Sequence, residues 1–335
     1  MKINYNAPIP NTFGIKALCD VFIEPTSNAE ILEALDIAKS CRTPWLITGE
    51  GSNLLFTGDF HGTVIHPITQ GITAACQGNG VTVTAMAGVR WDDLVAHCVA
   101  HGWHGLENLS LIPGTVGASA VQNIGAYGVE AKDVIMQVGV VDVLSGKQTE
   151  IDVASCNYAY RSSNFKHEWK GKYMVTHVTY RLSTVFEPHL DYGNIREVLA
   201  EKGIGQPSAA EVRYVIVEIR KNKLPDPQVE GNAGSFFLNP VIPVAQFETL
   251  RHEYPAMPFY PVDGQRMKIP AAWLIDQCGW KGKTMGPAGV HHKQALVLVN
   301  KGGASGADIM ALSDTIIHDV HQRFGIVIRP EVNVL

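Results

Sequence analysis

Apolar residues recur at helix and strand spacings along the whole chain, with stop signals between the runs. In the first segment one apolar helical face is formed by Ile31, Leu32, Leu35 and Ala38. Ser27 and Glu30 precede that face with the spacing of a capping box, which predicts the start of a helix. Short apolar runs at residues 45–48, 54–56 and 64–65 predict buried strands.

The middle of the chain alternates between strand and helix patterns. Residues 81–86 alternate apolar and polar positions, as expected of a half-exposed strand. Residues 91–99 carry apolar side chains at helical spacing, and Gly102 supplies the stop. Residues 134–182 predict a run of strands joined by turns that contain glycine.

The last third of the chain is mainly helical. Ser208 and Glu211 cap a predicted helix that ends at the proline-containing stretch 224–227. Pro270 and Gly279 bracket a short helix. The remaining expected elements are a strand at 295–299, a helix over 309–320 closed by Gly325, and a final strand at 326–328.

Composition narrows the class of protein. The chain has 335 residues, which suggests two or three domains, and 46% hydrophobic residues, enough for a sizeable core. A net charge of −5 and a pI near 6.2 predict no binding of nucleic acid. No run approaches the length of a membrane helix, and the N-terminus lacks a signal-peptide core. We therefore expect a cytoplasmic protein without an obligate protein partner, whose six scattered cysteines are reduced and mostly buried.

The thirteen histidines do not predict a metal site. His97 and His101 are one helical turn apart, but no glutamate or thiolate completes a zinc set. His291 and His292 are adjacent, and adjacent residues do not share a face of a helix or strand. We expect solvated or hydrogen-bonded histidines and no metal.

Two glycine-rich stretches are candidates for close contact with a ligand. Residues 49–53 miss the dinucleotide fingerprint, because Leu54 stands where a glycine is required and a strand follows. Their consecutive N–H groups suit a pyrophosphate, although a plain β-turn has the same sequence. Residues 112–128 are rich in small side chains, which allow either close approach to a flat or phosphorylated ligand or a tight packing corner.

Two polar features each have a functional and a structural interpretation. Ser235 lacks the glycines of a hydrolase nucleophile elbow, because Ala233 and Phe237 occupy those positions. The local sequence therefore favours a serine that caps a helix or closes a turn. The basic cluster at residues 220–223 either complements a helix dipole or recruits an anionic substrate, and composition does not separate the two.

Six motifs in a fixed order give the chain a family resemblance. They are GEGSNLL at 49–55, IPGTVGA at 112–118, QNIGAYG at 122–128, YRSSNF at 160–165, GNAGSFF at 231–237 and RPEV at 329–332. Together they resemble the MurB family, the UDP-N-acetylenolpyruvoylglucosamine reductases, over nearly the whole chain. The stretch LDYGN at 190–194 is similar to the tyrosine-bearing loop of type I members, which folds over the substrate.

This resemblance implies an α+β fold. It would comprise a two-subdomain FAD-binding module of the vanillyl-alcohol-oxidase (PCMH) type and a C-terminal α+β substrate-binding domain. The implied boundaries are residues 1–70 for FAD-binding subdomain 1, 71–205 for subdomain 2 with the tyrosine loop, and 206–325 for the substrate domain. The C-terminal strand, 326–335, would pack on or near subdomain 1.

The resemblance also implies roles for single residues. The catalytic set would be Arg161, Ser235 and Glu331. FAD would be held without a covalent bond by Gly49, Glu50, Gly51, Ser52, Asn53, Ile112, Gly114, Thr115, Gly117, Ala118, Gly125 and Arg161. The substrate would contact Tyr192, Lys223, Asn239, Tyr260, Lys268 and Gln294.

The implied reaction is the NADPH-driven reduction of UDP-N-acetylglucosamine enolpyruvate to UDP-N-acetylmuramate, for peptidoglycan precursor synthesis. Hydride would pass from NADPH to FAD N5 and then to the vinyl carbon. Arg161 suits the charge that builds on the carboxylate, Glu331 would polarise the same end, and Ser235 would protonate the neighbouring carbon. A flavin oxidase or dehydrogenase for another small substrate and a silent flavin-binding module are the alternatives, and the joint presence of all three residues argues against both.

Overall fold

The computed structural model describes all 335 residues and divides them into two units, each with its own hydrophobic core. The first unit comprises residues 1–7, 19–50 and 61–220, and the second comprises residues 8–18, 51–60 and 221–335. The chain therefore leaves and re-enters each unit more than once. The expected three-part division at residues 70 and 205 stays a prediction.

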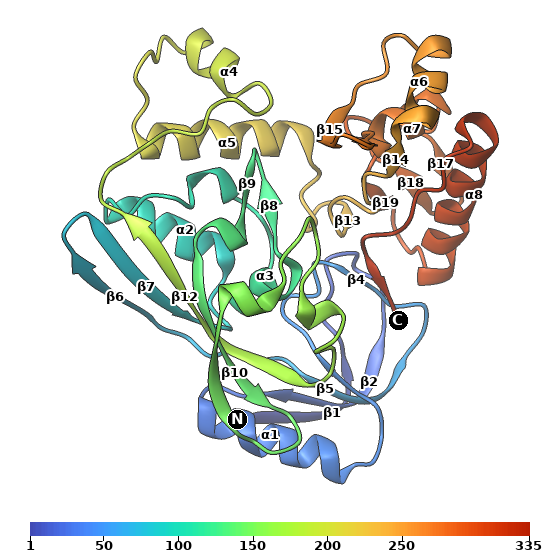
Figure 1. Ribbon diagram of the computed structural model, residues 1–335. Coiled ribbons are helices and arrows are strands. Elements are labelled where there is room, and N and C mark those ends of the chain that lie inside the picture. The colour runs from blue at the N-terminus through green and yellow to red at the C-terminus, as the bar shows by residue number, and fades with distance from the viewer. The chain divides into compact units, whose positions relative to one another are not determined.

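The N-terminal part of the first unit is a four-stranded sheet covered by one helix (Figure 1). The strand order is β1 (Lys2–Pro8), β2 (Leu18–Glu24), β5 (Phe60–Ile65) and β3 (Trp45–Ile47). Helix α1 (Asn28–Ser40) buries the predicted face at Ile31, Leu35 and Ala38, together with Ala34. Ser27 accepts the Glu30 N–H as predicted, but Glu30 accepts the N–H of Thr26, one residue earlier than a capping box requires.

A five-stranded antiparallel sheet forms the larger part of the first unit. Its order is β11 (Gln148–Asp152), β10 (Ile135–Asp142), β12 (Tyr173–Ser183), β7 (Gly80–Met86) and β6 (Ile72–Gln77). The predicted alternation in β7 is confirmed, because every second side chain is buried. The predicted run of strands over 134–182 is wrong for residues 153–167, which form 3₁₀ turns at Val153–Cys156 and Asn164–Lys166 and an isolated bridge between Ala159 and Ser162, whereas the turn expected around residues 170–171 is present.

Two helices pack against this sheet, and only one was predicted. Helix α2 (Trp91–Ala100) buries Trp91, Leu94, Val95 and Cys98 as its periodicity indicates. Helix α3 (Val116–Gln122) lies within the glycine-rich stretch 112–128, where no helix was predicted. Its residue Gly117 donates its N–H to the Ala87 carbonyl at 3.0 Å, so close packing against the sheet stabilises α3 where helix propensity does not. The hairpin β8 (Gly125–Ala126) and β9 (Val129–Glu130) follows.

Two further helices complete the first unit. Helix α4 (Ile195–Glu201) packs on α5 (Ala209–Lys223) through a small cluster that includes Ile195, Leu199, Val212 and Ile216. The predicted cap is confirmed, because Ser208 and Glu211 exchange hydrogen bonds in both directions. The last three residues of α5 belong to the second unit.

The second unit combines three small sheets with three helices, and two of the sheets have three or four strands. One sheet has the order β13 (Gly231–Asn232), β19 (Leu298–Asn300), β18 (Ala288–Val290) and β17 (Thr284–Met285), and the other has β14 (Val241–Pro243), β16 (Arg266–Lys268) and β15 (Tyr260–Asp263). The helices are α6 (Val244–Glu253), α7 (Ala271–Gln277) and α8 (Gly306–Phe324). Pro270 and Gly279 flank α7 and Gly325 ends α8 at φ 63°, as predicted.

The predicted strand at 326–328 is wrong. Ile326 and Ile328 are buried in the core of the second unit, which explains their apolar pattern, but they form no sheet ladder. The C-terminal strand is instead β20 (Asn333–Val334), which pairs in parallel with β4 (Leu54–Leu55). No helix of the chain is both long and apolar enough to cross a bilayer, and no group of three potential ligands is placed to bind a metal ion.

Thiol reactivity should follow burial, because all six cysteines are free. Ellman's reagent should modify the exposed Cys41 and Cys76 fastest in the native protein. Burial raises the pKa of the Cys98 thiol to about 12 and that of Cys156 to about 11, so these two should react only after unfolding in urea. Rapid labelling of Cys98 in native protein, identified by peptide mass spectrometry, would contradict this assignment.

Candidate active site

Glu50 joins the two glycine-rich segments of the first unit. Its Oε2 accepts the Gly114 N–H at 2.9 Å, and its Oε1 lies 3.0 Å from Nε of Arg90. The guanidinium balances the carboxylate, which would otherwise repel an anionic ligand here. Glu50 and Gly114 were both expected at the FAD site, and the structure brings them into direct contact.

Glycines bring these segments closer together than side chains would allow. A Cβ on Gly49 would lie 2.7 Å from Oγ1 of Thr115, and a Cβ on Gly117 would lie 2.9 Å from the Cβ of Ala87. Thr115 is the N-cap of α3 and accepts the Ala118 N–H at 3.5 Å. The first unit therefore has a stretch of closely packed backbone with few large side chains, which suits contact with a flat ring or a phosphate.

The same loop continues in the second unit with Gly51, Ser52 and Asn53. Gly51 has φ 68°, and a Cβ there would lie 2.3 Å from the carbonyl oxygen of Pro10, so only glycine fits. Asn53 donates to the Glu331 carbonyl at 3.4 Å and accepts the Asn333 N–H at 3.1 Å. The expected cofactor residue Asn53 and the expected catalytic residue Glu331 are thus neighbours.

Arg161 lies at the tip of a tight turn in the first unit. Ala159 and Ser162 exchange backbone hydrogen bonds of 3.0 Å, which leaves Tyr160 and Arg161 as the two turn residues. Arg161 is half-buried, has φ 53°, and donates from Nη2 to the Gly125 carbonyl at 2.9 Å. Two residues that the resemblance placed at the flavin, Arg161 and Gly125, are therefore in contact.

Strained backbone concentrates around this turn. Of the seven non-glycine residues with positive φ, five fall between positions 111 and 161, namely Leu111, Asn123, Tyr127, Asn157 and Arg161. Such conformations cost free energy and persist only where the surroundings fix them. Asn123 shows how, because its buried amide donates to the Ala159 carbonyl and to the Glu130 carboxylate, both at 2.9 Å. Asn123 at the C-terminal end of α3 therefore fixes the turn that carries Arg161.

Tyr192 lies on an exposed loop that packs against the β8–β9 turn. Its side chain is 46% exposed, and its Cβ would lie 3.4 Å from a Cβ on Gly128. The buried Asn108 joins the two segments, since its amide donates to the carbonyls of Tyr127 at 2.9 Å and His189 at 2.8 Å. The side chain is therefore displayed at the surface by a loop whose base is fixed.

Ser235 and Glu331 lie on adjacent extended segments of the second unit. The Glu331 N–H donates to the Phe236 carbonyl at 2.7 Å, and the Leu238 N–H donates to the Arg329 carbonyl at 2.9 Å. Phe236 and Phe237 are fully buried and anchor the segment, whereas Ser235 and Glu331 are half-buried. The structure thus brings together two of the three expected catalytic residues by backbone pairing.

Two of the expected substrate residues of the second unit, Tyr260 and Lys268, lie on the β14–β16–β15 sheet. Tyr260 faces Lys268 across the strand pair, and Nζ of Lys268 lies 5.6 Å from the centre of the Tyr260 ring. Asn239 precedes β14 and accepts the Ala271 N–H at 2.9 Å. Gln294 is half-buried and accepts the Leu296 N–H at 3.4 Å, and Lys223 is exposed at the end of α5.

A cavity of about 730 Å³ opens in the second unit beside the end of α5. Lys221, Asn222, His291 and Lys301 are among its lining residues. None of the expected catalytic or substrate residues lines it, although Lys223 and Gln294 are next in sequence to residues that do.

Arg220 was not predicted as a site residue, and the structure separates it from the lysines of its cluster. Burial lowers its pKa, and the group lies close to Tyr127 and Arg161. Burial raises the pKa of the Tyr127 hydroxyl, whose oxygen accepts a hydrogen bond from Arg220. Lys221 and Lys223 are exposed instead. The sequence signal was present but ambiguous, because four adjacent polar residues on one helix end do not reveal which of them faces inward.

Comparison with known proteins decides between the alternatives. The profile described as "UDP-N-acetylenolpyruvoylglucosamine reductase, C-terminal domain" matches residues 226–335, and the profile described as "FAD binding domain" matches residues 19–152. The chain is 52% identical to the UDP-N-acetylenolpyruvoylglucosamine reductase of Bacteroides fragilis over 336 aligned positions, covering all of both chains. The chain belongs to the UDP-N-acetylenolpyruvoylglucosamine reductase family.

Other members of this reductase family are similar to the chain over nearly its full length. The Pseudomonas aeruginosa reductase is 46% identical over 325 positions, which cover 97% of this chain and 96% of that one. The crystal structure of the reductase from Thermus caldophilus matches 100% of this chain and 99% of its own, with a TM-score of 0.66 at 21% identity. These matches confirm the resemblance and the α+β fold with an FAD-binding module. They also establish that the chain is an oxidoreductase, which excludes the silent flavin-binding module.

The tight fit of Gly51 gives a stability prediction for this reductase. Gly51→Ala should lower the free energy of unfolding by about 2–4 kcal/mol, because the new Cβ meets backbone and the residue must stay left-handed. Gly58→Ala is the matched control in the same unit, since nothing lies within 4 Å of its added Cβ. Urea unfolding measures both, and equal midpoints for the two variants would show that Gly51 is not constrained.

Proposed function

We propose that this chain catalyses the NADPH-dependent reduction of UDP-N-acetylglucosamine enolpyruvate to UDP-N-acetylmuramate, with FAD as a non-covalent cofactor. The observation that carries the proposal is the setting of Arg161, Ser235 and Glu331, each in its family motif and each held by the backbone of its segment. A reductase from another branch of the flavin enzymes would have no reason to retain all three.

The residues present fit an FAD. Gly49 and Gly117 lie where a Cβ would meet Thr115 and Ala87, so the backbone segments of this cradle in the first unit pack more closely than side chains would allow. Residues 49–53 contain no cysteine or histidine that would form a covalent link. Ile112, Ala118, Ser52 and Asn53 are half-buried, as expected of residues that a cofactor would cover. When bound, the flavin supplies the hydride chemistry, taking hydride from NADPH and delivering it to the vinyl carbon.

Arg161 is assigned to the carboxylate of the enolpyruvyl group. As the vinyl carbon receives hydride, negative charge grows on that carboxylate, and a preorganised guanidinium stabilises it without reorientation. The bond from Nη2 to the Gly125 carbonyl and the rigid turn beneath Arg161 provide this preorganisation. A lysine would not serve equally well, because it lacks the planar, multiply donating fork.

Glu331 is assigned to the carboxylate end of the substrate together with Arg161, and Ser235 is assigned to the proton transfer. Glu331 in its protonated form would hold the same carboxylate end, because an ionised carboxyl there would repel it. Ser235 would donate its hydroxyl proton to the carbon next to the carboxylate. A serine is a weak acid, so this role requires nearby positive or developing charge to make the proton available.

The remaining assigned residues suit a diphosphate nucleotide. Lys223 and Lys268 carry positive charge, Tyr260 offers a half-exposed ring, and Asn239 has a fixed amide. Gln294 adds an amide on the same unit. Tyr192, displayed on its exposed loop, would cover the bound nucleotide.

Lys223→Ala should raise the KM for the UDP-linked substrate about tenfold, as expected for one lost charge-assisted contact, and leave flavin reduction by NADPH nearly unchanged. Lys221→Ala is the control, because Lys221 is also exposed on the last turn of α5 but is not among the expected substrate residues. Steady-state kinetics at low and high salt measure the effect, which should shrink at high salt. An equal KM increase in both variants would mean that only net charge matters.

Ser235→Ala tests the chemical step of the proposed reaction. The variant should stay yellow and be bleached by NADPH at a near-normal rate. Recovery of the yellow colour on mixing with the enolpyruvyl substrate should slow by about 10²–10⁴-fold, the usual value of a positioned acid. Anaerobic stopped-flow absorbance follows the two half-reactions separately, and Ser235→Cys should recover part of the loss.

The structural alternative for Ser235 predicts a different outcome. If Ser235 only caps a helix or closes a turn, loss of its hydroxyl should lower the free energy of unfolding by roughly 0.5–2 kcal/mol. The loss should then affect both half-reactions alike. Recolouring at the wild-type rate would remove Ser235 from the mechanism and leave Glu331 as the candidate acid.

A further inference from the structure

A partly buried ion pair connects α2 to α5 in the first unit. Asp92, in the first turn of α2, accepts both guanidinium nitrogens of Arg213, from Nη1 at 2.7 Å and from Nη2 at 2.9 Å. The side chain of Asp92 is 27% exposed and that of Arg213 is 19% exposed, so solvent screens the pair only in part. Two parallel hydrogen bonds of this kind fix direction as well as distance.

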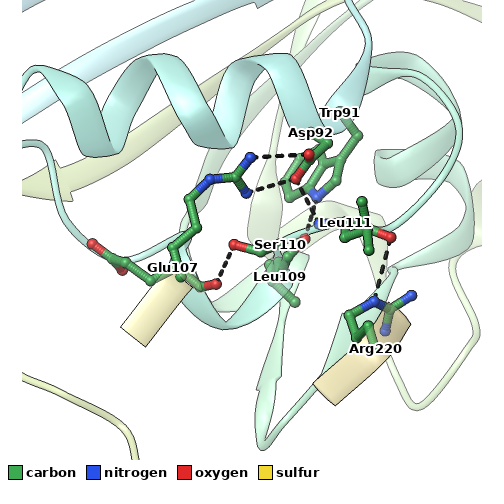
Figure 2. A network of polar contacts seen from close by, with 8 residues as sticks. Trp91, Asp92, Glu107, Leu109, Ser110, Leu111 and Arg220 are labelled. Atoms are coloured by element: carbon green, nitrogen blue, oxygen red, sulfur yellow. Dashed lines mark hydrogen bonds and ion pairs between the residues drawn. The ribbon is translucent and has the colours of Figure 1, made fainter. Parts of the chain in front are cut away.

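The same carboxylate holds the loop that leads into the flavin cradle. Asp92 Oδ1 also accepts the Leu111 N–H at 2.5 Å, as Figure 2 shows. Leu111 has φ 57°, a left-handed conformation that disfavours a leucine. Leu111 directly precedes Ile112, the first residue of the expected FAD-binding stretch.

Helix α5 holds the other polar group of Leu111. Nε of Arg220 donates to the Leu111 carbonyl at 3.3 Å. Arg213 and Arg220 are seven residues apart on one helix and therefore share a face. One arginine thus acts on the Leu111 N–H through Asp92, and the other acts on the Leu111 carbonyl directly.

The loop is fixed on both sides of Leu111 by Trp91, which is fully buried. The Trp91 indole donates to the Leu109 carbonyl at 2.8 Å, and its backbone N–H donates to the Gly114 carbonyl at 2.9 Å. Ser110 closes a local turn by donating to the Glu107 carbonyl at 2.6 Å. With both ends held, the direction of the chain between them is decided by the conformation of Leu111.

The charge state of Asp92 agrees with this geometry. Burial alone would raise its pKa, but the hydrogen bonds from the Arg213 guanidinium and the Leu111 N–H hold the pKa below its ordinary value. Asp92 is therefore ionised at neutral pH and accepts from both partners at once.

We propose that Asp92 and Arg213 are positioning residues for the cofactor: they keep Leu111 left-handed and thereby set the path of residues 112–115 before FAD binds. The proposal rests on the assignment of the 112–118 stretch to FAD. It does not depend on which substrate the enzyme reduces, because its measurements concern cofactor binding alone.

Titration of the apoprotein with FAD, followed by flavin fluorescence, measures the dissociation constant. Asp92→Asn and Arg213→Met should each weaken FAD binding about tenfold, because the loop relaxes toward conformations that leucine prefers. The double variant should bind no more weakly than the weaker single variant, since both changes release the same residue.

Leu111→Gly distinguishes positioning from general support of the fold. Glycine adopts positive φ at no steric cost, so Leu111→Gly combined with Asp92→Asn should restore FAD affinity to within about twofold of wild type. A merely structural ion pair would give no such rescue, because the added glycine does not replace a lost contact between α2 and α5. If Asp92→Asn gives no folded apoprotein, Arg213→Met with and without Leu111→Gly provides the same comparison.

Glu218→Gln is the matched control on the same helix. It breaks the 2.8 Å pair between Glu218 and Lys202, which does not contact the loop, and should leave FAD affinity unchanged. Wild-type affinity in both Asp92→Asn and Arg213→Met would overturn the proposal. So would failure of Leu111→Gly to restore binding, or an equal loss of affinity in Glu218→Gln.

Discussion

The carboxylate of Asp92 joins segments of the first unit that are far apart in the sequence. It accepts the Leu111 N–H and both Arg213 nitrogens, while Arg220 on the same helix holds the Leu111 carbonyl. The strained loop at Leu111 leads directly into the segment that Glu50 then fixes at Gly114. The position of the expected cofactor cradle therefore depends on side chains that would not themselves touch the cofactor.

Elsewhere in the candidate site of the first unit, buried side chains likewise fix the backbone that carries the expected functional residues. Arg161 has a left-handed backbone at the tip of its turn, and the buried amide of Asn123 donates to the Ala159 carbonyl at the base of that turn. A second buried amide, Asn108, joins the β8–β9 turn to the loop of Tyr192. Hydrogen bonds within a low-dielectric core are stronger than in water and cannot be exchanged for solvent contacts, so they keep the functional backbone in conformations it would otherwise leave.

The sequence predicts the elements whose signals are local. Helices α1, α5, α7 and α8 carry their own caps or stops, and β7 shows its two-residue period, so these were correct. Helix α3 was missed because its glycines and small residues are stabilised by packing against β7 and β12, which no local pattern records. The strand predicted at residues 326–328 was wrong because its apolar pattern also fits a segment that is buried in a core without pairing in a sheet.

Contacts between residues far apart in the sequence also limit how many of the site residues the sequence can predict. Family motifs point to Arg161, Ser235 and Glu331 as candidate catalytic residues, and the pairing of Phe236 with Glu331 brings two of these motifs side by side. The Asp92–Arg213 pair spans 121 positions and has no signature at either end. Arg220 is half-buried and Lys221 is exposed, and this difference is likewise decided only when α5 packs.

The central claim is that this backbone framework serves the reduction of a UDP-linked enol ether. The most direct measurement mixes the yellow protein, NADPH and UDP-N-acetylglucosamine enolpyruvate without oxygen and quantifies both NADPH consumption and product by chromatography. Parallel reactions replace the enol ether with simple alcohols and 2-hydroxy acids in air. We predict that NADPH consumption equals the UDP-N-acetylmuramate formed, with no oxidation of the alcohols or hydroxy acids. Oxidation of those compounds in air, with no UDP-N-acetylmuramate formed, would contradict the account.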